Sequence, residues 1–227
     1  MRIWIIRHAE SYSNTQGKLM SSTDLPLTDK GFLQAEAARD YLQAQLDTPA
    51  FDRVFSSPLL RAKQTAAILC GGEERIEVSS ALQEMNLGKL EGMTWAERAL
   101  GYPDVNMEGG LSGAALPEGE SFGDVQARCN QFLDQLKGYG NHETILVASH
   151  GITIRVLINT LLGKPDHCAN FINWADNAAL TEVEWNLPTG EKTLKRLSDR
   201  AHLTDSGLGN KTYDIWGVFS AVRYEDC

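Results

Sequence analysis

The chain begins with four consecutive apolar residues, Ile3 to Ile6, which are followed directly by Arg7 and His8. A short apolar run of this kind predicts a β-strand that is buried on both faces, as in the parallel sheets of α/β proteins. In an open α/β sheet, ligands bind beyond the carboxyl ends of the strands. A guanidinium and an imidazole suit a phosphate there, because the first can bind it bidentately and the second can act as base or nucleophile. Taken alone, however, the pair is better explained as the solvated end of a strand.

Two further predicted strands end in polar residues and lead directly into helices. Residues 54–55 mark a short strand, and the helix after it has Arg61 in its first turn. Residues 144–148 predict a buried strand that ends next to His150, and Gly151 begins a helix that is apolar nearly all round. In a parallel sheet the three junctions lie along one edge, where helix N-termini present free N–H groups and the positive end of the helix dipole. Two arginines, two histidines and two helix N-termini at one edge predict an anion-binding site.

The remaining pattern predicts a single α/β domain over residues 1–227. Residues 82–120 are rich in glycine and lack the apolar content for a core of their own, so we expect an insertion over the active site. Residues 179–185 alternate with period two, which predicts an antiparallel strand with one solvated face, paired with residues 192–198. The tail of residues 199–227 is polar, and its role is not predicted.

The other expected elements are a helix that starts at Thr28 or Asp29 and ends before Pro49, a helix with Pro58 in its first turn that ends near Cys70, a strand over 76–78, and helices over 94–100 and 121–136.

Charge and composition exclude several classes of function. The net charge of −9 argues against a nucleic-acid-binding surface, because such a surface needs a basic stripe. The apolar runs are too short to span a bilayer, and a strand so close to Met1 leaves no room for an N-terminal signal. The four cysteines have no C-x-x-C spacing, so we expect free thiols, no metal site and a cytoplasmic protein. The motif G-x-x-x-x-G-K-[ST] of nucleotide-binding kinases is absent, and no cofactor is predicted.

Six short motifs follow one another along the chain, from residue 7 to residue 151. They are R-H-x-E-S at 7–11, D-x-P-L-T-x-x-G at 24–31, S-S-P-L-x-R-A-x-Q-T-A at 56–66, L-x-E-M-x-x-G-x-x-E-G at 82–92, G-E-S at 119–121 and S-H-G at 149–151. In this order they closely resemble the histidine phosphatase (phosphoglycerate mutase-like) superfamily. The resemblance runs from residue 2 to about residue 185 and leaves the end of the chain unexplained.

The resemblance implies a three-layer α/β/α sandwich with a mostly parallel central sheet, and chemistry through a phosphohistidine. It assigns the nucleophile to His8 and the proton donor for the leaving group to Glu84. The other residues that it places at the site contact the phosphoryl group or line its pocket: Arg7, Asn14, Arg61, His150 and Gly151.

Elementary phosphoryl-transfer chemistry agrees with these roles. A neutral imidazole nitrogen can attack phosphorus in line, and the transition state then carries negative charge on three equatorial oxygens. Arg7, Arg61 and a protonated His150 can stabilise that charge without a metal ion. Glu84, held partly protonated near neutral pH, can supply a proton to the leaving alkoxide, and its carboxylate can then activate water.

Three positions near the predicted site leave alternatives open. Glu10 and Glu91 are also candidate acids, and we favour Glu84 because a longer motif surrounds it. Ala9 stands where the family most often has glycine. Its methyl group restricts access to positive φ, so the local backbone turn is less certain.

The resemblance covers two kinds of enzyme, and a third reading is a binding module. Phosphatases release the phosphoryl group to water, whereas mutases move it between positions of one sugar acid. We favour a phosphatase that acts on a small phosphorylated metabolite, because the segment after Glu84 and the modest insertion look more like that branch. The alternatives are a cofactor-dependent phosphoglycerate mutase and a silent module that binds a phospho-ligand. The sequence leaves the substrate and the oligomeric state open, with a homodimer as one option.

Overall fold

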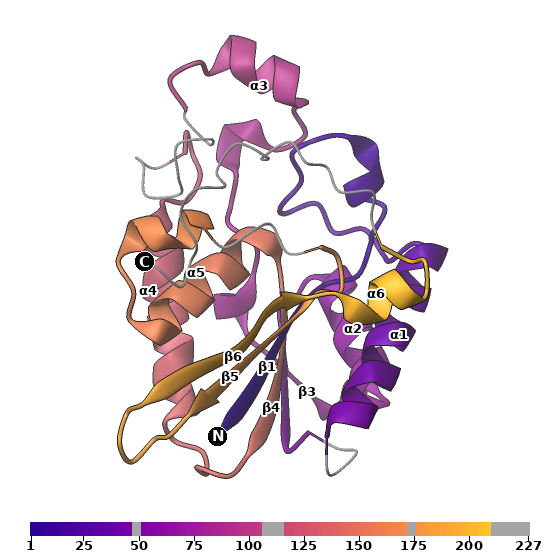
Figure 1. The fold of residues 1–227 in the computed structure, drawn as a ribbon. Helices are drawn as coiled ribbons and strands as arrows, with labels where there is room; N and C mark the ends of the chain where they lie inside the picture. The colour runs from indigo at the N-terminus through magenta and orange to yellow at the C-terminus, as the bar shows by residue number, and fades with distance from the viewer. Residues whose placement is uncertain (47–50, 106–115, 172–175, 210–227) are drawn as a thin grey trace.

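The computed structural model describes residues 1–46, 51–105, 116–171 and 176–209 (Figure 1). Six strands form one sheet in the order β3-β2-β4-β1-β5-β6. Their bounds are β1 Arg2–Arg7, β2 Arg53–Ser56, β3 Ile76–Val78, β4 Thr144–Ser149, β5 Leu180–Trp185 and β6 Lys192–Asp199. Strands β1 to β4 pair in parallel, whereas β5 runs antiparallel to both β1 and β6. The predicted mostly parallel sheet with an antiparallel pair at one edge is therefore confirmed.

Helices cover both faces of the sheet, which gives the predicted three-layer sandwich (Figure 1). The described helices are α1 Asp29–Gln45, α2 Leu60–Cys70, α3 Trp95–Gly101, α4 Phe122–Leu136, α5 Gly151–Leu162 and α6 Ala201–Asp205, together with short 3-10 helices at Asn14–Gln16, Glu73–Arg75, Ser80–Leu82, Gly88–Leu90 and Asp166–Phe171.

Strand β1 separates two hydrophobic cores by simple alternation of its side chains. Ile3 and Ile5 join the core formed with α4 and α5, whereas Trp4 and Ile6 join the core that includes residues of α1 and α2. All four side chains are at most 1% exposed. The apolar run at the start of the chain is thus buried on both faces, as predicted.

Two helix starts explain motif residues that carry no chemistry. Thr28 caps α1 by accepting a hydrogen bond from the Gly31 N–H, and Ser121 caps α4 in a reciprocal capping box with Asp124. Gly31 also packs directly against the backbone carbonyl of Glu10, where any side chain would collide. The glycine of the D-x-P-L-T-x-x-G motif is therefore required by close approach of two backbones.

The start of α2 differs from the sequence prediction. The helix begins at Leu60, so Pro58 precedes the cap residue Leu59 and does not belong to the first turn. Asp24, from the long loop after β1, accepts the hydrogen bond of the Leu60 N–H at 2.6 Å and so caps the helix from outside. Pro49, predicted to follow the end of α1, lies outside the described residues.

The described part of the insertion lies beyond the carboxyl ends of the strands (Figure 1). It joins the loop after β1 through backbone hydrogen bonds, from the Leu19 N–H to the Met93 carbonyl at 2.8 Å and from the Gly92 N–H to the Leu19 carbonyl at 2.7 Å. An isolated antiparallel bridge links Lys18 and Thr94 next to them. The loop and the insertion therefore form one connected wall on this side of the sheet.

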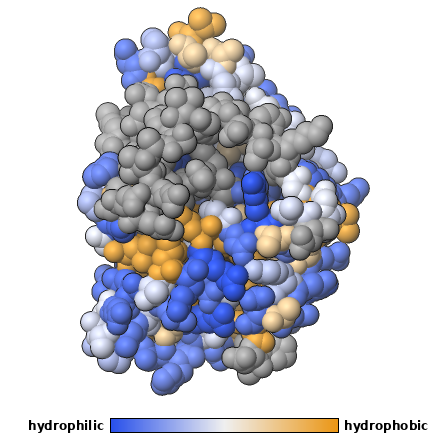
Figure 2. Space-filling view, in the orientation of Figure 1, coloured by the Kyte–Doolittle hydropathy of each residue, from blue (hydrophilic) through white to orange (hydrophobic). Residues whose placement is uncertain are grey.

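Strand β5 is antiparallel as predicted, but the expected solvated face is largely buried. The Glu182 side chain is only 4% exposed because Arg2 and Arg196 each bond one of its carboxylate oxygens, at 2.6 and 3.0 Å. Glu184, two residues on, is exposed. The period-two pattern identified the strand and missed the two arginines that allow a carboxylate to be buried there. Hydrophilic side chains cover most of the face around β6 (Figure 2).

Residues 201–209, after β6, pack on the domain, and their role was not predicted from the sequence. Leu203 of α6 is fully buried in the core on the α1 side of the sheet. The Gln34 side-chain amide donates to the Leu208 carbonyl at 2.9 Å, and His202 Nε2 lies 3.1 Å from the Ala178 carbonyl. Residues 201–209 are thus part of the folded domain.

The cysteines are not all free thiols, contrary to the prediction. Cys70 and Cys129 are buried and free, whereas Cys168 is in a disulfide bond. Burial raises the pKa of the Cys129 thiol to about 12, so this thiol stays protonated. Within the described ranges, no helix is both long and apolar enough to cross a membrane.

We predict that Leu203→Ala will lower the free energy of unfolding by about 2–5 kcal/mol, because it leaves a cavity in the core. Urea unfolding followed by circular dichroism measures the change. Leu100→Ala is the matched control, since Leu100 is 86% exposed and its truncation should cost less than about 0.5 kcal/mol. Equal effects of the two substitutions would show that residues beyond β6 do not contribute to the folded domain.

Candidate active site

The carboxyl ends of three neighbouring strands bring the predicted site residues together. Strand β4 lies between β1 and β2, and the residues that follow these strands continue the pairing. The His8 N–H donates to the Ser149 carbonyl at 2.9 Å, and the Ser57 N–H donates to the Ala148 carbonyl at 3.0 Å. His8, Ser57 and His150 therefore lie side by side at one edge of the sheet, as expected for parallel strands.

His8 is buried, and its ring is oriented by the backbone. Its Nδ1 lies 2.8 Å from the Ala9 carbonyl, an acceptor, so Nδ1 carries the proton and Nε2 keeps its lone pair. The ring centroid is 5.1 Å from that of His150. Burial, together with the positive charges of Arg61 and Arg7, lowers the pKa of His8 well below 6.5. The imidazole is therefore neutral at neutral pH, which is the form that can act as a nucleophile.

His150 is fully buried and differs from the prediction in its charge. Its Nε2 lies 2.8 Å from the Ser57 hydroxyl, whereas its Nδ1 has no hydrogen-bond partner among the described residues. Burial, followed by repulsion from His8, Arg61 and the other nearby arginines, lowers the pKa of His150 well below 6.5. We expected a protonated imidazole, but this desolvated and positive environment favours the neutral form.

The two arginines supply the positive charge of the site. Arg61 is 1% exposed, and its guanidinium donates to the carbonyls of Ser21 at 2.7 Å and Thr23 at 2.9 Å. Burial lowers the pKa of both Arg61 and Arg7, and the charge of Arg61 lowers that of Arg7 further. Both guanidinium groups remain charged even so, because an arginine cannot be deprotonated in a protein. The edge that holds the two neutral histidines therefore has a strongly positive potential.

Glu84 reaches the site from the insertion and lies at the start of α5. Its Oε1 accepts hydrogen bonds from the Met85 N–H at 2.9 Å and the Thr153 N–H at 3.1 Å, and its Oε2 from the Ile152 N–H at 3.3 Å. The charge of Glu84 also acts on both Arg7 and Arg61, raising their pKa values. The carboxylate thus lies within electrostatic range of both cations.

The two rival acids are occupied by structural interactions. The Glu91 carboxylate accepts hydrogen bonds from the backbone N–H and the hydroxyl of both Ser21 and Thr23. Burial alone would raise the pKa of Glu91, but these hydrogen bonds outweigh it and lower the pKa. Glu10 lies beside the start of α1, where it pairs with Lys30 at 3.2 Å. Both carboxylates therefore contribute to local structure in this arrangement.

The helix starts at this edge are less open than the sequence indicated. Asp24 bonds the Leu60 N–H of α2, and Glu84 bonds two N–H groups in the first turn of α5. Gly151, the first residue of α5, is buried beside His150. At both helix starts, a carboxylate of the same chain therefore accepts N–H hydrogen bonds that an anionic ligand could otherwise accept.

Two residues that sequence reasoning did not assign to the site also take part. Ser57, within the S-S-P motif, is the hydrogen-bond partner of His150. The Asn177 side-chain amide donates to the His8 carbonyl at 3.0 Å and to the Asn14 Oδ1 at 3.3 Å. Asn177 lies just before β5, far along the chain from His8, and no local pattern identifies it. The predicted residue Asn14 is thus linked to the His8 backbone through the Asn177 side chain.

Ala9 does not strain the backbone. The non-glycine residues with positive φ in the described part of the chain are Glu118, Ala178 and Ser198. The Ala9 N–H donates to the Thr65 hydroxyl at 3.0 Å, and its side chain is fully buried. The departure from glycine at this position is therefore accommodated without a left-handed conformation.

A mostly parallel sheet with two arginines and two histidines beyond its central strands is an arrangement built to hold an anion. The sequence profile of the histidine phosphatase superfamily (branch 1) matches residues 3–200. The chain therefore belongs to the histidine phosphatase superfamily, which confirms the resemblance. Within the described ranges, no three His, Cys, Asp or Glu side chains are grouped so that they could hold a metal ion.

Individual relatives include a mutase and phosphatases. A Yersinia pestis (strain Pestoides F) protein named "Probable phosphoglycerate mutase GpmB" is 29% identical over 215 residues, which cover 89% of this chain and 95% of the relative. The solved structure of the α-ribazole phosphatase from Shigella flexneri is 28% identical with a TM-score of 0.75, and the match covers 88% of this chain and 98% of the other. A mycobacterial glucosyl-3-phosphoglycerate phosphatase, 24% identical with a TM-score of 0.75 and 88% and 99% coverage, shares the fold.

The lowered histidine pKa values predict that the folded protein becomes less stable as the pH is lowered below about 6.5. An unfolded chain binds protons at its histidines below about pH 6.5, whereas buried His8, His150 and His202 resist protonation in the folded state. Stability is therefore complete above pH 6.5 and is lost as pH falls towards the folded pKa values. Each histidine contributes a slope of up to about 1.4 kcal/mol per pH unit.

Urea unfolding at pH 7.0 and pH 5.5 measures this slope. His150→Asn should make it smaller, whereas His142→Asn should leave it unchanged, because His142 is exposed. A slope that does not change in His150→Asn would show that the folded protein binds a proton at this site as readily as the unfolded chain does.

Proposed function

We propose that this protein is a phosphomonoester hydrolase that works through a phosphohistidine on His8. The observation that carries the proposal is the state of the His8 ring. Its Nδ1 proton is held by the Ala9 carbonyl, so the neutral ring presents Nε2 as a nucleophile. Arg7 and Arg61 lie close enough to lower its pKa, and so close enough to attract a phosphate dianion.

In the first step, Nε2 of His8 forms a bond to phosphorus while the bond from phosphorus to the leaving oxygen breaks. The charge on the three equatorial oxygens is stabilised by Arg7, Arg61 and His150. The surroundings of His150 favour its neutral form, which offers one N–H donor. Binding of a dianion favours its protonated form, which would add a third positive charge.

Glu84 is proposed as the group that gives its proton to the leaving oxygen. The step needs Glu84 in its protonated form beside the leaving oxygen. Water then attacks phosphorus, the bond from phosphorus to nitrogen breaks, and inorganic phosphate leaves. Glu84 takes up the proton of that water and returns to its starting state.

Phosphatase activity on a small phosphorylated metabolite is favoured over the mutase alternative. The α-ribazole phosphatase of Shigella flexneri supports this choice, whereas the relative named as a phosphoglycerate mutase supports the alternative. The two activities differ in whether water reaches the phosphohistidine before a second acceptor does. We keep the cytoplasm as the proposed location on the basis of the sequence, whereas the disulfide bond of Cys168 is a feature that is rare in reducing compartments. We infer that the reaction needs no metal because two arginines supply the positive charge.

The decisive test is hydrolysis of p-nitrophenyl phosphate in the presence of a metal chelator. We expect the wild-type protein to turn over and His8→Ala to lose more than about 1,000-fold in kcat, as when other catalytic nucleophiles are removed. His142→Ala, which removes an exposed histidine, is the matched control and should keep full activity. Loss of wild-type activity on chelation, or retention of it in His8→Ala, would refute the proposal. A wild type that ignores this ester but interconverts phosphoglycerates would establish the mutase.

The role of Glu84 predicts a dependence on the leaving group. Glu84→Gln should slow the hydrolysis of alkyl phosphates about 100-fold or more, because a poor leaving group needs the proton. Turnover of p-nitrophenyl phosphate should fall much less, because p-nitrophenolate leaves without one. Steady-state rates on the two esters give the comparison, with Glu10→Gln as the rival acid. Equal losses on both esters in Glu84→Gln would remove Glu84 from the role of acid.

A further inference from the structure

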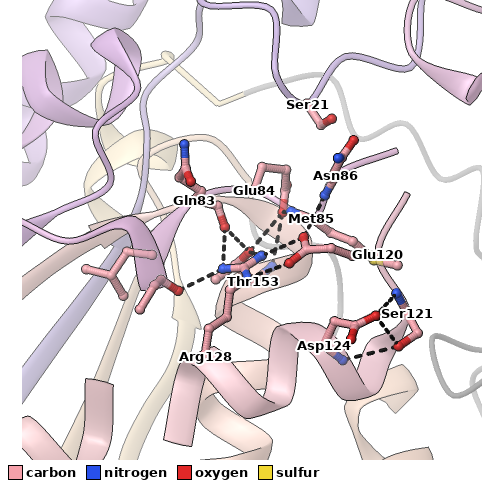
Figure 3. A network of polar contacts seen from close by, with 12 residues as sticks. Ser21, Gln83, Glu84, Met85, Asn86, Glu120, Ser121, Asp124, Arg128 and Thr153 are labelled. Carbon is pink, nitrogen blue, oxygen red and sulfur yellow. Dashed lines mark hydrogen bonds and ion pairs between the residues drawn. The ribbon is translucent and has the colours of Figure 1, made fainter. Parts of the chain in front are cut away.

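The short segment that carries Glu84 is held by side chains from two helices (Figure 3). Arg128 of α4 donates from Nη1 to the Ala81 carbonyl at 2.7 Å and to the Gln83 carbonyl at 2.8 Å. The Thr153 hydroxyl of α5 also donates to the Gln83 carbonyl, at 2.5 Å. The backbone immediately before Glu84 is therefore fixed by direct hydrogen bonds from the helical layer.

The same arginine controls the backbone after Glu84 through an ion pair. Arg128 Nε and Nη2 bond the two carboxylate oxygens of Glu120 at 2.9 and 3.1 Å, which is a bidentate arrangement. Glu120 Oε2 in turn accepts the Asn86 N–H at 2.8 Å. The side chains of this pair are only 16% and 24% exposed, so solvent screens it less than an ordinary surface ion pair. One arginine and one glutamate thus hold both ends of the segment 81–86.

This arrangement gives a physical meaning to the G-E-S motif, to which the chemistry of the site assigns no role. A Cβ atom at Gly119 would lie 2.5 Å from the Asn86 carbonyl oxygen, so only glycine lets the backbone at 119 approach the backbone at 86 this closely. Glu120 then donates its N–H to that same carbonyl at 2.9 Å, while its carboxylate bonds Arg128. Ser121 caps α4, the helix on which Arg128 lies. All three motif residues therefore serve the geometry of the segment that carries Glu84.

We propose that Arg128, paired with Glu120, is the positioning residue that holds Glu84 within reach of the leaving group. The proposal rests on the proposed function, in which Glu84 is the acid. Removing the guanidinium would remove the Arg128 hydrogen bonds to the Ala81 carbonyl and the Glu120 carboxylate, and would leave the Gln83 carbonyl with Thr153 as its donor. The segment would then move together with Glu84, while the proposed nucleophile His8, directly after β1, would be left in place.

The kinetic test compares Arg128→Gln and Arg128→Lys with a matched arginine variant. Arg53→Gln is the control, because Arg53 pairs with two glutamates at the opposite end of β2. Arg128→Gln should lose about 10-fold or more in kcat on alkyl phosphates and much less on p-nitrophenyl phosphate. The double variant with Glu84→Gln should be no slower than Glu84→Gln alone. Equal losses on both esters, or additive losses in the double variant, would overturn the proposal.

Arg128→Lys separates geometry from charge, which matters because the charge of Arg128 also acts on His150. Lysine keeps the charge but cannot make the bidentate pair and both carbonyl contacts at once. We therefore expect Arg128→Lys to keep the defect on alkyl phosphates. Recovery of wild-type rates on both esters in this variant would mean that charge alone suffices, and would overturn the positioning role.

Hydrogen–deuterium exchange tests the positioning independently of turnover. The N–H groups of Met85, Ile152 and Thr153 are bonded to the Glu84 carboxylate, and that of Asn86 is bonded to Glu120. Exchange in peptides that cover 82–86 and 151–154 should be faster in Arg128→Gln and Arg128→Lys, and unchanged in Arg53→Gln. Unchanged exchange in both Arg128 variants would refute the proposal. A wild type that hydrolyses no phosphate ester would refute the proposed function, and the exchange data would still decide whether Arg128 holds the segment.

Discussion

The site depends on a positive charge that is buried without a direct counter-ion among the described residues. The guanidinium of Arg61 is held by the carbonyls of Ser21 and Thr23, which satisfy its N–H groups and leave its charge in place. Desolvation makes such a charge costly, and the same desolvation strengthens its action on its surroundings. The neutral state of His8 follows directly from this environment. The burial of Arg61 and its hydrogen bonds to neutral carbonyls therefore also help to keep His8 neutral.

Carboxylates enter this positive region only where the fold restrains them. Asp24 and Glu84 each bond N–H groups at a helix start, and Glu91 is surrounded by the hydrogen bonds of a single loop. An unrestrained carboxylate would move to the nearest guanidinium and block the place where a phosphate would bind. The helix starts thus compete with the arginines for the acidic side chains.

The sequence predicted the layers of the fold and the edge of the sheet at which the site residues lie. The edge followed from local signals, because apolar runs mark buried strands and parallel strands end at one edge. The three layers followed from the family resemblance. The sequence could not predict features that depend on partners distant in the chain. Glu182 is buried only because two arginines from other strands reach it, and Asn177 lies beside His8 with no motif to mark it. The charge of His150 and the disulfide of Cys168 likewise depend on tertiary surroundings that spacing does not reveal.

The side-chain amide of Gln34 connects two regions that the sequence treats as unrelated. Its oxygen accepts the N–H of Glu10, which lies two residues after His8. Its nitrogen donates to the carbonyl of Leu208, which lies beyond the residues that the family profile matches. The amide group is planar, so it can bond both partners only if both lie close to its plane. The boundary of the family match is therefore not a boundary of the cooperative unit. A chain shortened to residue 200 would lose the Leu208 carbonyl, and with it one of the partners that orient the Gln34 amide beside the loop after His8.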